Sequence, residues 1–405
     1  VTIKSENGDS TSVILTDSAN ALTSNFTVHI FGTDYLTIRN LTIRRPGSDA
    51  SSCVFLIALN SRFLQIRNNI IESDNTAGTN ESGALVDFPL AGANDSSITF
   101  SNNVFNHGSY AIFIQGQSTA SLVPLAQITN NEFNNQSYRA INLVYVSAPN
   151  VQGNRISTTS ANFDFRGIYF RQARHDLKVI SNKVSGVRTG YALYFDTCIG
   201  DPGNRGLIAN NFLETEGTGT ADGIYLRKCS ALNFYYNSVN ITSTSTSSAA
   251  FYLSSSGDSL LNIKNNIFVN SGAGITYFIS SGGMNSISSS DYNDLYVKPP
   301  NTAFAFVDTG YVVNFAGWKT ISSLDTNSVS GNPQFISQTD LHVGDPVVNN
   351  TGVFVASVTT DIDGQTRSNT TPDIGADEFA PLANNIGIVS FVSPKSGICG
   401  DSAIV

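Results

Sequence analysis

Short apolar segments and asparagines recur in one pattern along most of this chain. The pattern reads apolar, any residue, Asn or a small residue, Asn, any residue, apolar, and residues 66–71 (IRNNII) are one copy, with Asn69 in the second Asn slot. Later copies fill that slot with Asn103, Asn131, Asn154, Asn182, Asn211, Asn237, Asn266 and Asn293, and an earlier copy has Leu41 there. Successive copies lie 23 to 34 residues apart. A repeat of this length predicts a solenoid, in which each unit buries its apolar face against the next.

The repeated segments are strands rather than helices. They are short, rich in Ile, Val, Phe and Tyr, and alternate apolar and polar positions. Three short strands and three turns fit in each unit, so we predict an all-β right-handed parallel β-helix of about ten coils, roughly 48 Å long. The recurrent Asn is expected to enter the left-handed region at a turn. Its amide is also expected to hydrogen-bond to the equivalent Asn of the next coil.

The repeat fades after Tyr296, and Pro299 and Pro300 break the run. We therefore predict a β-helix over residues 1–300 and a C-terminal capping region over 301–380, with Trp318 in a short helix or packed loop. Residues 381–405 are expected to form a linker and the first strands of a following β-sandwich module. Because the chain begins in mid-strand, we expect it to be a piece of a longer protein.

Composition narrows the class of protein. Charged residues make up 13% of the chain, and its formal net charge is −9. Nucleic acid is not an expected partner, since its recognition needs clustered Lys and Arg. Membrane insertion is not expected either, because no long uncharged apolar run is present. Cys198 and Cys229 have equal offsets in adjacent coils, which leaves a disulfide and two stacked thiols as open alternatives.

The C-terminal third carries a family resemblance. Residues 332–335 (NPQF), 340–342 (DLH), 361–367 (DIDGQTR) and 372–378 (PDIGADE) look like the closing section of bacterial right-handed β-helix repeat proteins. Such domains occur in large adhesin-like surface proteins secreted by the type IX system, and residues 1–10 are similar to their early coils. The resemblance implies an extracellular or cell-surface location and a multi-module architecture.

We expect a non-catalytic module that acts as a rigid spacer and an adhesive, glycan-contacting surface. Its expected partners are surface glycans or cell-surface proteins and neighbouring modules of the same polypeptide, and self-association into a fibre or homo-oligomer remains an alternative. A polysaccharide lyase or hydrolase is the other alternative. Its best catalytic candidates are Arg171, His175 and Asp176, and His107 in the sequence Asn-His-Gly is a distant match to a hydrolase motif.

An acidic cluster near the C-terminus has two interpretations. Its calcium candidates are Asp361, Asp363, Asp373 and Asp377, since hard cations take carboxylate oxygens. The sequence does not follow EF-hand spacing, however. The preferred interpretation is a capping turn that covers the open end of the solenoid, in which Arg367 pairs with one or two of these carboxylates or the neighbouring Glu378. No cofactor is therefore predicted.

One predicted strand per coil supplies a candidate binding face. Alignment of these strands puts Phe113, Asn142, Tyr169, Tyr194, Tyr225 and Tyr252 in one outward column, and Gln115, Val144, Arg171, Asp196, Arg227 and Ser254 in a parallel column. We predict a row of exposed tyrosine rings edged by Arg171 and Arg227 that binds a sugar chain. Alternatively, the rings stack on one another and stiffen the sheet.

Overall fold

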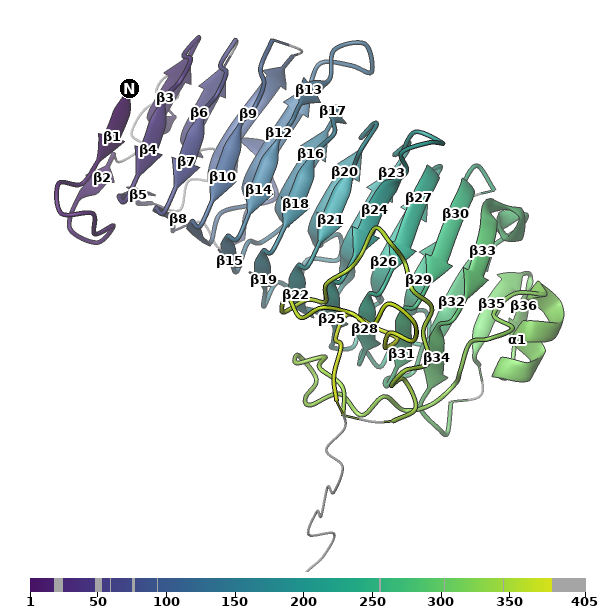
Figure 1. The fold of residues 1–405 in the computed structure, drawn as a ribbon. Helices are drawn as coiled ribbons and strands as arrows, with labels where there is room; N and C mark the ends of the chain where they lie inside the picture. The colour runs from purple at the N-terminus through teal and green to yellow at the C-terminus, as the bar shows by residue number, and fades with distance from the viewer. Residues whose placement is uncertain are drawn as a thin grey trace, which may run out of the picture.

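The computed structural model describes residues 1–17, 25–47, 53–58, 60–74, 77–92, 94–254, 256–301, 303–344 and 346–380. These residues form a right-handed parallel β-helix followed by a largely irregular C-terminal segment (Figure 1). The predicted fold class is confirmed. The predicted β-sandwich strands in residues 381–405 lie outside the described residues.

Three long sheets run along the rod, each taking one strand from every coil. Sheet A contains β1 (Thr2–Lys4), β4 (Thr37–Arg39), β7 (Gln65–Arg67), β10 (Thr99–Ser101), β14 (Gln127–Thr129), β18 (Asn150–Gln152), β21 (Lys178–Ile180), β24 (Gly206–Ala209), β27 (Ser230–Tyr235), β30 (Ser259–Lys264) and β33 (Ile287–Asp291). Sheet B contains β2 (Ile14–Thr16), β5 (Thr42–Arg45), β8 (Ile70–Ser73), β11 (Val104–Asn106), β15 (Glu132–Asn134), β19 (Arg155–Ser157), β22 (Lys183–Val187), β25 (Phe212–Thr215), β28 (Ser238–Ile241), β31 (Ile267–Asn270) and β34 (Asp294–Val297).

Sheet C contains β3 (Phe26–Phe31), β6 (Cys53–Ala58), β9 (Val86–Ala91), β12 (Tyr110–Gly116), β16 (Arg139–Val144), β20 (Arg166–Arg171), β23 (Gly190–Asp196), β26 (Ala221–Arg227), β29 (Ala249–Leu253), β32 (Ile275–Ser280), β35 (Ala305–Asp308) and the antiparallel β36 (Gly310–Val312). The short strands β13 (Val123–Pro124) and β17 (Val146–Ser147) form a separate two-stranded sheet. Two 3₁₀ turns span Glu81–Gly83 and Gly283–Ser286. The register predicted for sheet C is confirmed, since Ile112 pairs with Ile141, Ile141 with Ile168, and Ile168 with Leu193. These inward residues are fully buried in one continuous core.

The asparagine ladder forms at the turn between sheets A and B. The backbone N–H and Nδ2 of Asn103 both donate to Oδ1 of Asn131, over 2.9 and 3.0 Å, and Asn103 Nδ2 also donates to the carbonyl of Ile66. The same pattern joins every coil from Asn69 to Asn293. The expectation that the ladder Asn itself is left-handed is wrong. The preceding residue takes that conformation, as in Asn102 with φ of 54°, because only the buried position lets an amide face both neighbouring coils.

The far end of the rod is closed by β35, β36 and helix α1 (Phe315–Ser322), which confirms a short helix around Trp318. The indole of Trp318 stacks on Tyr277 at 4.8 Å and donates to the buried carboxylate of Asp325 over 2.8 Å. Asp325 also accepts from Asn293 Nδ2, so it terminates the asparagine ladder. Burial raises the pKa of Asp325, and the bonds from Ser328 and Asn293 oppose that rise.

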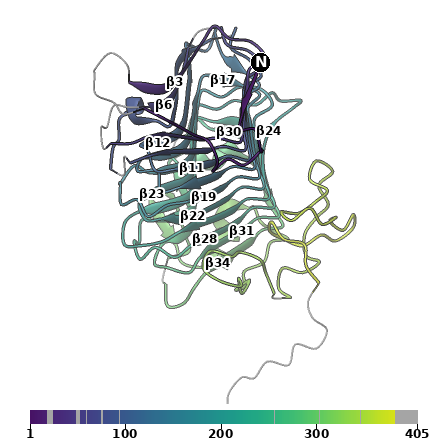
Figure 2. The same ribbon diagram turned by 90° about the vertical axis from the view of Figure 1, so that its left-hand side faces the viewer.

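The rest of the capping region does not cover the end. Residues 332–344 and 346–380, here called the strap, turn back and lie against the flank of the rod over β25, β28 and β31 (Figures 1 and 2). Three small apolar clusters attach it, and they combine strap residues Leu341, Val343, Val348, Val358, Ile374 and Ala376 with rod residues Phe212, Tyr236, Ile267 and Val269. Among the described residues, no helix has the length and hydropathy needed to cross a membrane.

Candidate functional site

The predicted tyrosine column is present on the outer side of sheet C, but it is not a row of exposed rings. Tyr169, Tyr194, Tyr225 and Tyr252 follow one another in register. The exposed fractions of Tyr169 and Tyr194 are only 5% and 7%, so their predicted exposure is wrong. Tyr225 and Tyr252 are half-buried. Neighbouring aromatic and Arg side chains on the same sheet cover the column.

The rings in this column stack on one another, so each ring covers a face of its neighbour. Tyr225 stacks between Tyr194 at 4.5 Å and Tyr252 at 4.8 Å, with interplanar angles of 24° and 25°. The stack continues through Phe278 and Phe306 at 4.1 and 4.7 Å. A sugar that stacks on an aromatic residue needs a free ring face. The arrangement therefore matches the alternative interpretation, in which stacking stiffens the sheet.

An Arg–Asp–Tyr network covers the N-terminal part of the column. Arg139 and Arg166 both bond to the Asp164 carboxylate, at 3.3 and 2.7 Å, and the Tyr138 hydroxyl donates to it over 2.8 Å. The Arg166 guanidinium also lies 4.1 Å from the centroid of the Tyr194 ring. Burial acts to raise the pKa of Asp164, but the Arg166 charge and the Tyr138 bond outweigh it and hold that pKa below its usual value. Asp164 is therefore a persistent anion and unsuited to be a general acid.

The structure does not bring the alternative catalytic candidates together. His175 pairs with Asp201 at 3.2 Å, and Asp176 pairs with Lys178 at 2.8 Å. Arg171 is exposed and its side chain has no polar partner among the described residues. Arg227, the other predicted edge residue, is paired with Asp196 at 3.3 Å.

The predicted calcium ligands divide into two sets. Asp361 and Asp373 are buried and accept backbone N–H groups within the strap, such as Gln365 N at 2.7 Å and Phe379 N at 2.8 Å. Arg367 bonds to Glu378 at 3.3 Å, which confirms the expected Arg–carboxylate pairing. These carboxylates therefore hold the strap in shape.

Asp363 and Asp377 instead converge on His342. Their ligand atoms lie within 4.8 Å of one another, and His342 Nε2 is 2.7 Å from Asp363. One imidazole and two carboxylates match a transition metal better than calcium, which takes six to eight oxygen ligands.

A cleft of about 430 Å³ separates the strap from sheet B beside this cluster. Arg155, Lys183, Phe212 and Glu214 line it from the rod, and residues 339–342 line it from the strap. Burial raises the pKa of Glu214, against the Gly186 N–H bond that lowers it. Burial would lower the pKa of His342, but its bonds to Asp340 and Asp363 outweigh this and raise it.

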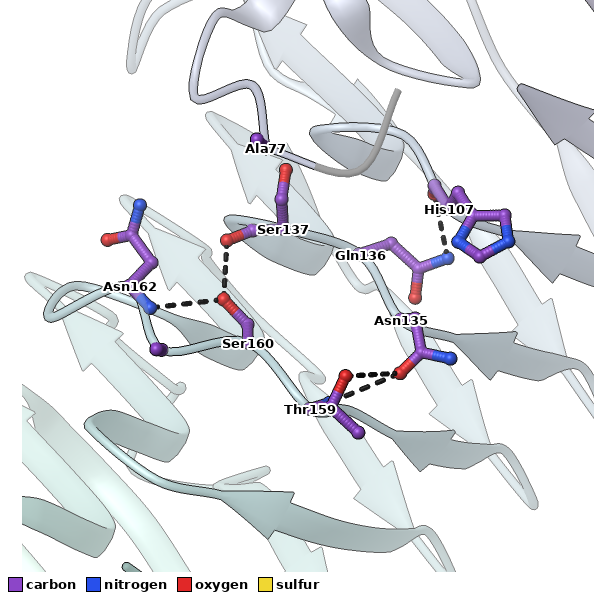
Figure 3. Close-up of a pocket in the computed structure, with 9 residues that line it drawn as sticks. Ala77, His107, Asn135, Gln136, Ser137, Thr159, Ser160 and Asn162 are labelled. Carbon is purple, nitrogen blue, oxygen red and sulfur yellow. Dashed lines mark hydrogen bonds between the residues drawn. The ribbon is translucent and has the colours of Figure 1, made fainter. Parts of the chain in front are cut away.

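A neutral groove lies at the turn between sheets B and C (Figure 3). We call it the corner groove; its volume is about 450 Å³, and it is lined by Ala77, His107, Asn135, Gln136, Ser137, Thr159, Ser160, Ala161 and Asn162. Consecutive coils supply these residues, and their hydroxyls largely bond to the backbone, as Ser160 Oγ does to Ser137 O over 2.7 Å. Ser137 Oγ donates to the carbonyl of Gly78, which holds the segment above the groove.

The sequence contained a partial signal for this groove. The Asn-His-Gly segment marks His107, but only as a distant match to a catalytic motif. Gln136, Ser160 and Asn162 stand in polar stretches after strands β15 and β19. These turns differ in length from coil to coil, so the strand repeat does not align them. Their proximity emerges only in three dimensions.

The family model described as "Right handed beta helix region" matches residues 90–291. That span runs from the end of β9 to the end of β33 and contains most of the asparagine ladder. The match and the observed coils define this chain as a right-handed parallel β-helix protein. No curated protein sequence matches it.

Proposed function

We propose that this chain is a non-catalytic β-helix module of a secreted or cell-surface multi-module protein. It resembles the β-helix domains of the large surface proteins that the type IX system secretes. It serves as a rigid spacer, and it contacts glycans or cell-surface proteins. The observation that carries the proposal is the unbroken ladder of buried asparagines from Asn69 to Asn293. Each coil is bonded to the next through side chains as well as backbone, so bending the rod at any coil requires breaking buried hydrogen bonds.

Rigidity is tested by pulling single molecules between their termini in a force spectrometer. A spacer should resist extension and then unfold in steps of one or a few coils, because solenoid repeats contact mainly their neighbours. A chain that extends smoothly at low force would contradict the proposal. Sedimentation at increasing concentration separates a monomeric spacer from the fibre-forming alternative, which would grow into larger species.

A polysaccharide-active enzyme is the second candidate function. It is favoured by the strap cleft, where the buried Glu214, with its raised pKa, lies near His342 and Lys183. The soluble chain should be screened on uronic-acid and neutral polymers. Turnover abolished by Glu214→Gln or His342→Gln would establish this second function. Turnover abolished instead by Arg171→Ala or His175→Ala would place the chemistry at the end of β20 and in the turn that follows it.

A further inference from the structure

Gln136 is one of the corner-groove residues whose hydrogen bonding is incomplete within the described part of the chain. Its exposed fraction is 1%, and its Nε2 donates to the carbonyls of Phe105, His107 and Asn134 over 3.1, 3.1 and 3.2 Å. Three carbonyl acceptors fix which end of the amide is nitrogen. Its Oε1 therefore has a defined position, and this buried atom has no partner among the described residues.

In Figure 3 the amide nitrogen of Gln136 is directed at His107, and Oε1 is on the opposite arm of the amide, on the side of Asn135. His107 Nδ1 is a second buried polar atom in the groove without a partner in the described part of the chain. A buried acceptor left without a donor loses the hydrogen bonds that it makes with water in the unfolded chain, which is unfavourable. A bound molecule that supplies an O–H or N–H donor to Gln136 makes up for that loss.

The lining also limits the charge of the ligand. Apart from His107, every side chain that lines the groove is an amide, a hydroxyl or a methyl group. An ammonium group placed here would lose hydration without meeting an opposite charge, and a carboxylate or sulfate would meet no Lys or Arg among these lining residues. Ligands with several neutral hydroxyls match these walls best, because each hydroxyl both donates and accepts.

The groove continues along the rod axis. A neighbouring cavity of about 400 Å³ shares Ala161 and is lined further on by Arg188, Thr189, Glu216 and residues 217–219. Arg188 and Glu216 are paired at 3.1 Å, so this extension adds no net charge. The combined path crosses successive coils at one corner of the rod, which suits an extended chain-like ligand rather than a compact one.

We propose that the corner groove binds an uncharged oligosaccharide chain, with one sugar hydroxyl donating to Gln136 Oε1. This site deepens the proposed role in glycan contact and rests on it. It is separate from the tyrosine column, whose ring faces are occupied, and from the charged strap cleft.

The test fills the groove without removing any of its hydrogen bonds. Ala161 is exposed and stands where the two cavities meet, so Ala161→Trp places an indole in the path of the ligand. Ala161→Ser is the conservative control. Ala120→Trp, at an exposed position on another loop, controls for the added aromatic surface.

Binding is measured by titration calorimetry of the whole chain with hexasaccharides of glucose, mannose, xylose and galactose, and with an oligogalacturonate of equal length. At least one neutral hexasaccharide should bind with millimolar or tighter Kd and more tightly than the oligogalacturonate. Ala161→Trp should weaken that binding at least about ten-fold, the scale of one lost buried hydrogen bond, and both controls should bind as the parent does.

Three results would overturn the assignment. They are no binding of any neutral hexasaccharide, tighter binding of the oligogalacturonate, or unchanged binding by a folded Ala161→Trp variant. A stiff rod that fails these titrations refutes the groove but not the spacer role. A flexible chain that passes them refutes the spacer role but not the groove.

Discussion

The guanidinium of Arg367 donates a hydrogen bond over 2.9 Å to the side-chain oxygen of Asn210, which lies 157 positions earlier in the chain. The same guanidinium bonds to Glu378 and lies 3.9 Å from the centroid of the Tyr236 ring. Asn210 returns a bond from its Nδ2 to the carbonyl of Thr360 over 2.7 Å. This exchange fastens the strap to a turn of the rod that would otherwise face solvent.

Replacing Arg367 by Met should loosen the strap while leaving the rod folded. The substitution leaves the Glu378 carboxylate without its cation and the Asn210 oxygen without its donor. Removing one member of a buried pair costs roughly 3–5 kcal/mol. Hydrogen exchange should show faster opening of residues 346–380 and unchanged protection of β10 to β16. The double variant Arg367→Met/Glu378→Gln should recover part of the loss, and equal exchange in parent and single variant would count against this account.

Substitution of a buried ladder asparagine should lower the free energy of unfolding much more than substitution of the exposed residue that precedes it. Asn103→Ala removes the acceptor used by both Asn69 donors and the donor to Ile66, so we expect a loss of about 3 kcal/mol in unfolding free energy. Asn102→Gly changes an exposed residue with φ of 54°, which glycine adopts without strain, so its effect should stay within about 0.5 kcal/mol. Urea titration followed by hydrogen exchange measures the unfolding free energy of both variants. Equal losses in the two variants would refute the different roles assigned to Asn102 and Asn103.

The contrast between Asn102 and Asn103 shows what a sequence pattern can and cannot decide. The period, the three strands and the ladder follow from short-range alternation that every coil repeats, so they could be predicted. Which of two adjacent asparagines is left-handed depends on which one faces the neighbouring coils, and composition does not distinguish them.

Contacts between segments that are far apart in the chain are not marked by any repeating sequence pattern. The strap reaches Asn210 and Asn265 from more than 80 positions away, and nothing at those two asparagines marks the contact. The tyrosine register was predictable from strand alignment. The burial of Tyr169 was not, because Arg139 and Arg166 cover it through side-chain conformations that the pattern does not specify.

The aromatic stack of sheet C should contribute stability rather than ligand contact. Tyr225→Ala removes a ring held between two others, so we expect a loss of about 2 kcal/mol, whereas Tyr225→Phe retains the ring and should behave as the parent does. Thermal unfolding of both variants measures the difference. The outcome that would instead support a sugar-binding tyrosine face is a Tyr194→Ala/Tyr225→Ala variant of parental stability that no longer binds any glycan.

A buried carboxyl at the start of β26 should make stability depend on pH. Asp222 has an exposed fraction of 2%, and its Oδ1 accepts the Ala249 N–H over 2.8 Å. Burial raises the pKa of this carboxyl from 3.8 to about 7, against the Ala249 bond that lowers it. Between these values the folded chain retains a proton that the unfolded chain has lost. Unfolding free energy from this group therefore falls as pH rises from about 4 to about 7, and changes little above that.

Asp222→Asn isolates this contribution, because the amide retains the acceptor oxygen for Ala249 but cannot ionise. The variant should match the parent near pH 4 and be more stable near pH 8, by an amount whose upper limit is about 4 kcal/mol for a shift of roughly three pKa units. Other carboxyls with raised pKa values, such as Asp258 at about 6, act equally in both proteins and cancel in the difference. Urea titrations at half-unit pH steps give the two curves. Parallel curves would show that Asp222 is ionised in the folded chain and that its burial is compensated by contacts other than Ala249.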